Sequence, residues 1–248
     1  MKAMILAAGL GTRLRPLTND RPKALVTVAG HTLLEIALRR LRGCGVREAI
    51  VNTHHHAEMI EYYLKANRNF GMRIEISREE ELLDTGGGLK KAAHFFLEDG
   101  AREPFLLHNV DVISTIDLLR MVCFHAEHGA LATLAVQERE TSRYLLFDED
   151  GQLCGRRAGR DGADELARPA REAHALAFSG IHVLSPQIFA KMGEEGAFPI
   201  VSSYLNLAAR GEKIAAFRAD EWYWRDLGRP ESILQSGEDL DSGKYRIA

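Results

Sequence analysis

The chain has 248 residues, of which 46% are hydrophobic, and a formal net charge of −3. That length and apolar content suffice for one large α/β domain with a sizeable core, and the negative balance argues against a broad nucleic-acid-binding surface. The three cysteines, Cys44, Cys123 and Cys154, form no C-x-x-C pair, which is typical of a reducing compartment. No apolar run reaches the roughly 18 residues of a membrane span, and the N-terminus lacks a basic region with a cleavage site. We therefore expect a cytoplasmic protein that contacts neither nucleic acid nor a membrane.

The N-terminal segment combines a strand with a charged, glycine-containing loop. Residues 2–7 (KAMILA) predict a buried strand, and a loop of small residues follows at once. Gly9 and Gly11 let backbone N–H groups approach an anion without a Cβ in the way. Arg13 can fork onto phosphate oxygens, and Lys23 adds a point charge. The segment therefore predicts an anion site, most simply for the phosphates of a nucleotide.

Two familiar phosphate-binding motifs do not fit this loop. Walker A requires Gly-Lys-Ser/Thr, whereas Gly11 is followed by Thr12 and Arg13. The dinucleotide fingerprint requires a third glycine where this chain has Leu14. The remaining alternative is a plain strand-to-helix turn with arginines on its surface.

The next elements alternate between strand and helix. Hydrophobic spacing predicts helices at 33–41 and 57–64 and strands at 48–53 and 72–76. Such alternation is typical of βαβ units and a largely parallel sheet. We expect 155–172 to be an irregular, polar loop. The other expected strands are 104–107, 131–136, 144–147, 152–154, 175–184, 214–217 and 221–225, and the other expected helices are 89–97, 118–128, 198–210, one that starts at Ser185–Pro186 and one that starts at Pro230.

Three candidate ligand-binding features follow predicted strands: a run of glycines and two aspartates. Gly86, Gly87 and Gly88 open a helix after the third strand, at the edge where open α/β sheets bind ligands; a flexible loop is the alternative. Asp111 follows the strand 104–107 and could bind Mg²⁺, or it could be an ordinary N-cap or turn residue. Asp226 ends another strand and, taken alone, is an ordinary turn residue.

A run of three histidines invites a metal interpretation. His54, His55 and His56 are consecutive, so they cannot all face one site, and no acidic or cysteine partner is spaced for zinc. We interpret the run as a strand-to-helix connection.

The N-terminal motif resembles that of the sugar-1-phosphate nucleotidyltransferases. Those enzymes open with G-x-G-T-R-x-x-P after a strand and follow it with a Pro-Lys pair, as residues 9–16 and 22–23 do here. The resemblance runs from Lys2 to about Leu234 with the motifs in family order, and it is strongest to compact bacterial enzymes such as N-acetylmuramate 1-phosphate uridylyltransferase and heptose or mannose 1-phosphate guanylyltransferases.

The resemblance implies roles for particular residues. It implies that Arg13, Lys23 and Asp111 are catalytic, that Asp111 and Asp226 bind Mg²⁺, and that Arg168 contacts the sugar phosphate. The implied nucleotide-binding set is Ala7, Ala8, Gly9, Gly11, Thr12, Arg13, Lys23, Glu79, Gly86, Gly87 and Asn109, and the implied acceptor-binding set is Asn109, Arg168, Ser179 and Gly180.

The chain departs from the family at three positions in these motifs, and one of them is Ala24, which stands where a proline usually follows the lysine. Val110 stands where a glycine commonly precedes the metal-binding Asp, and Ala167 stands where a Glu precedes the phosphate-binding residue. Glu79 would read the edge of the nucleobase, but a carboxylate can accept hydrogen bonds from uracil, thymine or guanine, so the base stays open.

The implied fold is a Rossmann-like three-layer α/β/α domain, with a mostly parallel central sheet and a small antiparallel extension. We expect one domain over residues 1–248, with the nucleotide-binding part at about 1–112 and the acceptor-binding part at about 113–248. The implied reaction joins an NTP and a sugar 1-phosphate into an NDP-sugar and pyrophosphate with Mg²⁺, in a monomer or homodimer. The alternatives are a phosphocholine cytidylyltransferase, for which Trp222, Tyr223 and Trp224 could form a choline cage, and a non-catalytic nucleotide-sugar-binding subunit.

Overall fold

The N-terminal apolar run forms the strand β1 (Lys2–Leu6) in the computed structural model, which describes residues 1–100 and 102–247. β1 lies in the sheet between β4 (Glu48–Thr53) and β6 (Phe105–Asn109), and β5 (Arg73–Arg78) lies beyond β4. These four strands pair in parallel. Their carboxyl ends therefore meet at one edge of the sheet, which is where the polar loops of the sequence emerge.

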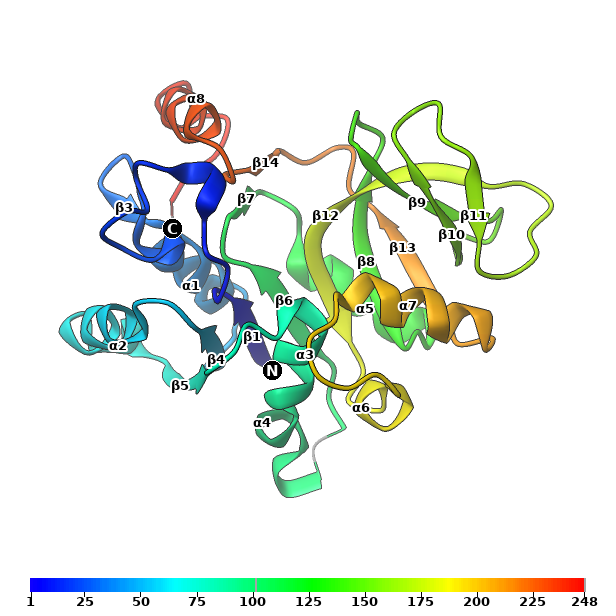
Figure 1. Cartoon of the computed structure of the whole chain (residues 1–248), viewed down its shortest axis with the longest axis horizontal. Helices are drawn as coiled ribbons and strands as arrows, with labels where there is room; N and C mark the ends of the chain where they lie inside the picture. Colours follow the sequence, from blue (N-terminus) through cyan, green and yellow to red (C-terminus); the bar gives the residue numbers. More distant parts are fainter. Residues whose placement is uncertain (101, 248) are drawn as a thin grey trace.

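An antiparallel region continues the sheet beyond β6. The long strand β12 (His174–Leu184) pairs with β8 (Ala132–Gln137) along one edge, and along the other edge with β9 (Arg143–Phe147) at its start and with β6 at its end. Figure 1 shows β12 as a long curved strand between the parallel strands and this outer region. The outer strands are β10 (Leu153–Ala158) and β11 (Asp164–Leu166), and β13 (Ile214–Arg218) pairs in parallel with β8.

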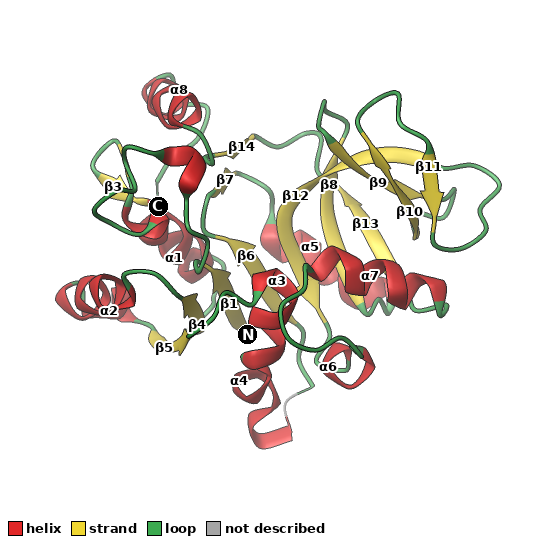
Figure 2. Cartoon of the chain, in the orientation of Figure 1, coloured by secondary structure: helices red, strands yellow, loops and turns green. Residues whose placement is uncertain are grey.

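Helices cover both faces of the sheet, as Figure 2 shows by colour. Because side chains alternate along a strand, Ala3 and Ile5 pack into one hydrophobic core while Met4 and Leu6 pack into the other. The first core is closed by α1 (Leu33–Gly43), α2 (Ala57–Ala66), α5 (Leu118–His128) and α8 (Pro230–Asp241). The second is closed by α3 (Asp84–Lys91), α4 (Ala93–Leu97), α6 (Ile188–Lys191) and α7 (Ile200–Ala209).

Short elements complete the chain. Two small sheets pair β2 (Thr27–Val28) with β3 (His31–Thr32) and β7 (Val112–Ser114) with β14 (Trp224–Asp226). The 3₁₀ turns are η1 (Thr12–Leu14), η2 (Lys23–Leu25), η3 (Arg68–Gly71) and η4 (Glu98–Gly100). The pairing of β7 with β14 matters most, because it brings the segment after β6 next to a segment more than a hundred residues later.

The three-layer α/β/α prediction is confirmed, and several local predictions were wrong. Residues 155–172 are not an irregular loop throughout, because β10 and β11 form an antiparallel ladder within them. The helix expected at 89–97 begins earlier, at Asp84, and is interrupted at Ala92. The helix expected from Ser185 begins at Ile188. Among the described residues, no helix is both long and apolar enough to cross a membrane.

Candidate active site

A cleft of about 480 Å³ opens at the carboxyl edge of β1, β4 and β6. The loop after β1 contributes Ala8 and Gly9 to it, and the segment after β6 contributes Asn109 and Asp111. Lys23, at the start of η2, reaches into the same space. The other lining residues are Leu6, Asn52, Glu79, Leu82, Asp84, Thr85, Val110 and Ala197. The tertiary structure thus gathers separate segments of the chain at one edge of the sheet.

One wall of the cleft is held by Asn52 at the end of β4. Its Oδ1 accepts a 2.7 Å hydrogen bond from the backbone N–H of Ala7, and its Nδ2 donates to Oε1 of Glu79 at 2.7 Å. The second oxygen of Glu79 accepts from the backbone N–H of Leu83 at 3.0 Å. Gly88 packs so close that an added Cβ would lie 2.7 Å from Oε1 of Glu79. Asn52 and Gly88 therefore fix the orientation of the Glu79 carboxylate, which is itself buried.

The opposite wall carries the ion pair of Lys23 and Asp111. The ammonium Nζ of Lys23 donates to Oδ2 of Asp111, and the two side chains are only 12% and 13% exposed. Gly11 lies against the stem of this lysine, because a Cβ at Gly11 would be 3.1 Å from Lys23 Cβ. A short, shielded ion pair of this kind resists screening by salt. It places a cation against Asp111, the carboxylate for which the family resemblance implies a metal-binding role.

An irregularity in β12 lies where the parallel strands meet the antiparallel region of the sheet. The register of β12 against β8 shifts between Phe178 and His182, and Gly180 within it has φ of +71°. A Cβ at Gly180 would lie 2.7 Å from Nδ2 of Asn109. The glycine is needed twice, for the left-handed backbone and for the close approach of Asn109.

The paired strands β7 and β14 bring the second carboxylate to this edge. Asp226 pairs in register with Val112, and the N–H of Leu227 donates to the carbonyl oxygen of Asp111 at 2.8 Å. Oδ1 of Asp226 accepts from the N–H of Gly228 at 2.8 Å. A Cβ at Gly228 would lie 2.9 Å from Nη2 of Arg13, so the guanidinium from the first loop reaches this strand. Arg13, Asp111 and Asp226 therefore belong to one neighbourhood.

Comparison with known proteins agrees with this geometry. The family model described as "Nucleotidyl transferase" matches residues 2–243. The chain belongs to the nucleotidyl transferase family. It is 36% identical over 243 residues to N-acetylmuramate alpha-1-phosphate uridylyltransferase of Caulobacter vibrioides, with 94% of this chain and 93% of that protein covered.

One further relative and one solved structure support this assignment. Identity is 30% over 243 residues to the mannose-1-phosphate guanylyltransferase catalytic subunit beta of Drosophila melanogaster, a longer protein of which 61% is covered, against 94% of this chain. A solved structure of UDP-glucose pyrophosphorylase with UDP-glucose superposes with a TM-score of 0.76, covering 97% of this chain and 98% of that one at 19% identity. The structural comparison shows the shared fold. The uridylyltransferase and the guanylyltransferase make this chain a nucleotidyltransferase of the class that forms nucleotide sugars.

Asp111 and Asp226 are the carboxylates that could hold a divalent cation at this edge of the sheet. In the described part of the chain no three His, Cys, Asp or Glu side chains cluster as metal ligands, which leaves Asp111 and Asp226 as a pair. Mg²⁺ is commonly held by one or two carboxylates together with substrate phosphates. The buried Asp111 already pairs with a cation, Lys23, so an anionic carboxylate facing positive charge is built into the site.

The glycines of the turn after β5 serve packing rather than lining the cleft. The N–H groups of Gly86 and Gly87 donate to the carbonyl oxygen of Phe198 at 2.9 and 3.3 Å. A Cβ at Gly86 would lie 2.3 Å from the ring of Phe198, and one at Gly87 would lie 2.3 Å from the carbonyl oxygen of Gly196. The cleft wall nearby is formed instead by Leu82, Asp84 and Thr85. The glycines allow helix α3 to pack tightly against the segment before α7.

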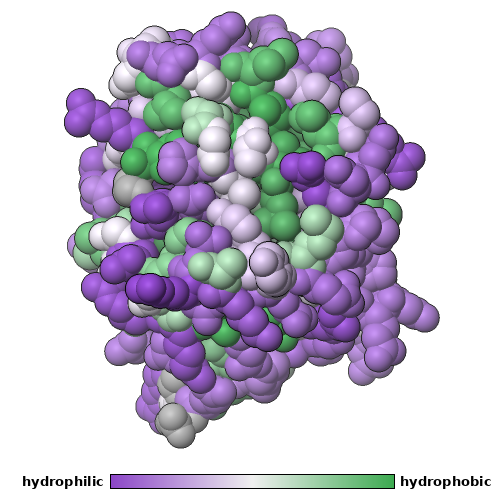
Figure 3. All heavy atoms as spheres, turned by 90° about the vertical axis from the view of Figure 1, so that its left-hand side faces the viewer, coloured by the Kyte–Doolittle hydropathy of each residue, from purple (hydrophilic) through white to green (hydrophobic). Residues whose placement is uncertain are grey.

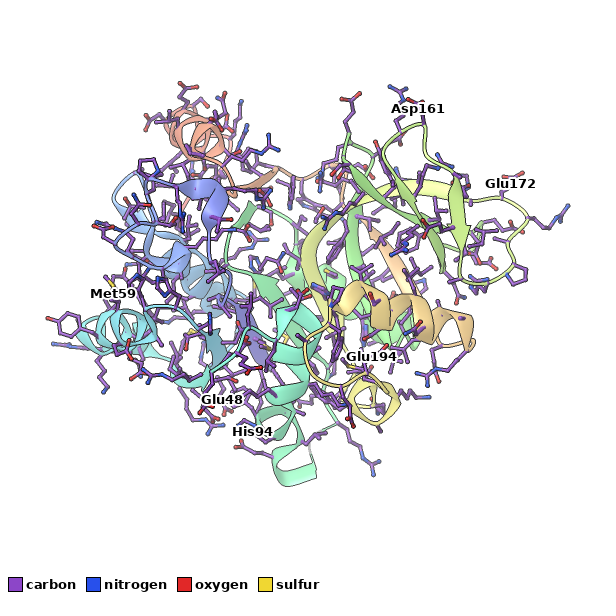
Figure 4. All side chains as sticks on the ribbon, viewed as in Figure 1. Glu48, Met59, His94, Asp161, Glu172 and Glu194 are labelled. Carbon is purple, nitrogen blue, oxygen red and sulfur yellow. The ribbon has the colours of Figure 1, made fainter. Side chains whose placement is uncertain are left out.

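The structure does not bring Arg168 to the cleft. Its Nη2 donates to Oδ2 of Asp148, and its Nε donates to the carbonyl oxygen of Leu153 at 3.0 Å, both at the turn between β9 and β10. In Figure 4 the neighbouring landmarks Asp161 and Glu172 extend at the outer end of the antiparallel region, away from β1 and β6. Arg168 therefore stabilises the outer hairpin.

The three aromatic residues after β13 line one hollow with Arg139, but each ring packs against a different neighbour. Trp222 stacks on Phe217 with centroids 5.6 Å apart, and Tyr223 stacks on Tyr245 at 5.1 Å. The guanidinium of Arg139 covers the ring of Trp224, 3.6 Å from its centroid. A positive charge already occupies the face that a choline cage would need.

A second hollow lies between the first loop and α8 on another face. Figure 3 shows hydrophobic residues gathered in the upper part of that face, with hydrophilic residues around and below them. The two charged residues that line the hollow, Asp20 and Arg21, form an ion pair with each other at 2.9 Å. The rest of the lining is Pro16, Leu17, Val26, Thr27, Pro230, Ile233 and Leu234. Triphosphate needs positive charge and polar donors, so the first cleft is the better candidate.

Asn52, which lines the cleft, and Arg139, whose guanidinium covers Trp224, were not singled out from the sequence. Asn52 was treated as part of a strand, although an amide at the end of the apolar run 49–51 is a recognisable sign of a carboxyl-edge ligand residue. Arg139 lies just beyond β8, and its contacts depend on β12 and β14, which only the tertiary structure brings to it.

Proposed function

We propose that this nucleotidyltransferase uses the cleft at the carboxyl edge of β1, β4 and β6 to join an NTP to a sugar 1-phosphate, with release of pyrophosphate. The observation that carries the proposal is the convergence of the glycine loop, Lys23, Asn109 and Asp111 in one cleft. The backbone contact between Leu227 and Asp111, which anchors Asp226 beside it, extends that cleft toward the acceptor.

The nucleobase would lie against the wall held by Asn52. Glu79 lines this wall, and each of its oxygens takes one hydrogen bond from the protein. Every carboxylate oxygen has a second lone pair, so Glu79 can still accept from the N–H groups of a base. Both the uracil of a uridylyltransferase and the guanine of a guanylyltransferase present such donors, and the relatives include both kinds of enzyme.

The phosphates would lie between the first loop and Lys23. Ala8 and Gly9 line the cleft with little side chain, which leaves their backbone accessible. An ammonium group has three donors, so Lys23 can contact a phosphate oxygen while it keeps its contact with Asp111. Arg13, beside Gly228, is placed to pair with the departing phosphates.

Asp111 and Asp226 would hold Mg²⁺. When bound, the ion supplies charge neutralisation to the phosphate oxygens. The buried position of Asp111 and the backbone pairing of β7 with β14 hold both carboxylates on rigid elements rather than on free loops.

The chemical step would be a single in-line displacement. A phosphate oxygen of the sugar 1-phosphate forms a bond to the α-phosphorus of the NTP as the bond from the α-phosphorus to the bridging oxygen of the β-phosphate breaks, and pyrophosphate leaves with the electron pair. The attacking phosphate is already ionised at neutral pH, so no general base is needed. The protein supplies positioning and positive charge, as phosphoryl-type transfer requires.

The runner-up acceptor is phosphocholine. Against it stand the engagement of Trp222 with Phe217 and of Tyr223 with Tyr245, and the guanidinium that covers Trp224. A cationic trimethylammonium group would meet Arg139 at like charge.

The test is a pyrophosphate-release screen of the four common NTPs against a panel of sugar 1-phosphates and phosphocholine, with Mg²⁺ present. We expect release with at least one sugar 1-phosphate and none with phosphocholine. Release with phosphocholine alone would replace the proposal with the cytidylyltransferase, and silence across the matrix would favour a binding subunit.

A further inference from the structure

Arg139 is a partly buried cation just after the end of β8, and among the described residues it forms no ion pair. Its Nη2 donates to the carbonyl oxygen of Phe178 at 2.7 Å, whereas its Nε is buried without a hydrogen-bond acceptor. In the part of the chain that the structure describes, no Asp or Glu forms an ion pair with it. Nearby arginines differ, since Arg157 pairs with Asp164 at 2.5 Å and Arg168 pairs with Asp148.

The guanidinium is held in place by an aromatic ring. Its carbon Cζ lies 3.6 Å from the centroid of Trp224, close enough for a stacked cation–π contact. The indole Nε1 of Trp224 donates to the carbonyl oxygen of Ser179 at 2.7 Å. Phe178 and Ser179 thus offer consecutive carbonyl groups to Arg139 and Trp224, at the irregularity of β12. The arginine is fixed before any ligand binds.

Arg139 lies near Asp226, the carboxylate of β14, because it stacks on Trp224 of the same strand. Trp224 and Asp226 are two residues apart in one strand and therefore project to the same face. Burial lowers the pKa of Arg139, and the negative charge of Asp226 opposes that shift. Gly180, the next residue after Ser179, packs against Asn109 of the cleft. Arg139 therefore stands on the acceptor side of the site, within the field of Asp226.

We propose that Arg139 binds the phosphate of the acceptor, in the role that the sequence suggested for Arg168. The proposal rests on the proposed function, because it assumes that the acceptor is a phosphate ester. A desolvated guanidinium without a counter-ion is unfavourable in the free protein, and its planar fork matches two phosphate oxygens. An incoming phosphate supplies the missing negative charge and an acceptor for the remaining N–H donors.

The first experiment measures steady-state kinetics of Arg139→Gln, Arg139→Lys and Arg157→Gln with the sugar 1-phosphate and NTP that the screen identifies. Loss of a charge-assisted hydrogen bond should raise the KM for the acceptor by about 10- to 100-fold in Arg139→Gln. The KM for the NTP should change by less than about 2-fold, and Arg139→Lys should recover part of the loss. Arg157→Gln removes the same charge from the outer hairpin and should leave both constants unchanged.

An equal rise in both KM values, or a loss in Arg168→Gln with none in Arg139→Gln, would overturn the proposal. Thermal melting of each variant separates loss of binding from loss of fold. Arg139→Lys keeps the charge, so it reports on the site even where Arg139→Gln unfolds.

The second experiment does not depend on turnover. In a Trp222→Phe background, Trp224 is the remaining tryptophan, and inorganic phosphate is titrated while its fluorescence is recorded. We expect a saturable change with Arg139 present and at least a tenfold weaker response in Arg139→Gln. The same response in both proteins would overturn the assignment. If the screen is silent but this titration behaves as expected, the proposed reaction fails while the anion site stands.

Discussion

The charged residues that line the cleft on the proposed nucleotide side have protein partners, whereas Arg139 on the proposed acceptor side forms no ion pair among the described residues. On the nucleotide side the charges and polar groups are already matched, since Lys23 pairs with Asp111 and Glu79 is held by Asn52 and Leu83. On the acceptor side Arg139 lies over Trp224 with no carboxylate paired to it in the described residues. In the proposed division of the site, the nucleotide side is organised in advance and Arg139 leaves an interaction for the acceptor.

A physical reason underlies this difference. The nucleotide side is built on the ends of parallel strands, where loops from β1, β4 and β6 converge and can satisfy one another. The acceptor side is built on the irregularity of β12 and on the short strand β14, where backbone carbonyls rather than carboxylates face the arginine. The following predictions test this comparison, from the largest expected effect to the smallest.

Replacement of Asp111 should cause the largest loss of activity. Asp111→Asn keeps the size of the side chain but removes the negative charge opposite Lys23, so turnover should fall by about 10²-fold or more. The measurement is the rate of pyrophosphate release with saturating Mg²⁺. Asp164→Asn removes a carboxylate from the outer hairpin and should keep normal turnover. Near-normal turnover of Asp111→Asn would remove this residue from the site.

Two glycine substitutions should separate the two sides. Gly88→Ala would push a Cβ against Glu79 and Asn52, and Gly180→Ala would push one against Asn109. Misplacement on this scale should raise the KM for the NTP in the first variant, and for the acceptor in the second, by about 10-fold or more. Gly180→Ala should also lose about 1–3 kcal/mol of stability because of its positive φ.

The matched control for both is Gly193→Ala, since a Cβ at Gly193 meets nothing within 4 Å. Steady-state kinetics with each substrate varied in turn is the measurement. If both variants affect both substrates equally, the division of the cleft into two sides is wrong.

Acid should destabilise the acceptor side through buried His125. The two ring nitrogens of His125 form hydrogen bonds with Thr133 Oγ1 and Ser185 Oγ, both at 2.9 Å. Burial lowers the pKa of the ring from 6.5 to about 4. Between pH 6.5 and about 4 the unfolded chain binds a proton that the folded chain does not. Stability should therefore fall as the pH falls, by about 1.4 kcal/mol per pH unit for this residue.

Urea unfolding of the wild type and of His125→Gln at several pH values between 7.5 and 4.5 tests this expectation. The variant should show a shallower dependence of the free energy of unfolding on pH, by one proton. Identical slopes for the two proteins would mean that His125 titrates normally in the folded chain.

The smallest expected effect concerns Lys23 and Mg²⁺. In Lys23→Ala the buried carboxylate of Asp111 loses its ammonium partner, so a divalent cation should stabilise this variant more than the wild type. We expect the rise in Tm on adding millimolar Mg²⁺ to be larger by about 2–4 °C in the variant. The additional rise should disappear in the double variant Lys23→Ala, Asp111→Asn. Equal shifts in the wild type and in Lys23→Ala would argue that the lysine does not occupy the cation position.

Much of the nucleotide side could be predicted from the sequence because its groups lie next to strands that are easily recognised. Gly9, Lys23 and Asp111 each lie within a few residues of an apolar run or a proline, and the parallel topology places the ends of such runs at one edge. The same reasoning did not foresee the packing role of Gly86 and Gly87, because a glycine-rich turn can serve close packing as well as ligand approach.

What the sequence determined by itself was therefore the order of strands and helices, the family and the charged loops at the carboxyl edge. Hydrophobic periodicity and local motifs are short-range properties, and they are written directly in the chain. The tertiary structure alone decided that Arg168 binds the outer hairpin and that Arg139 stacks on Trp224. These contacts join residues 20 and 85 positions apart in the chain. The second forms where Arg139 meets Phe178 of β12 and Trp224 of β14, and no local pattern specifies which arginine reaches which partner.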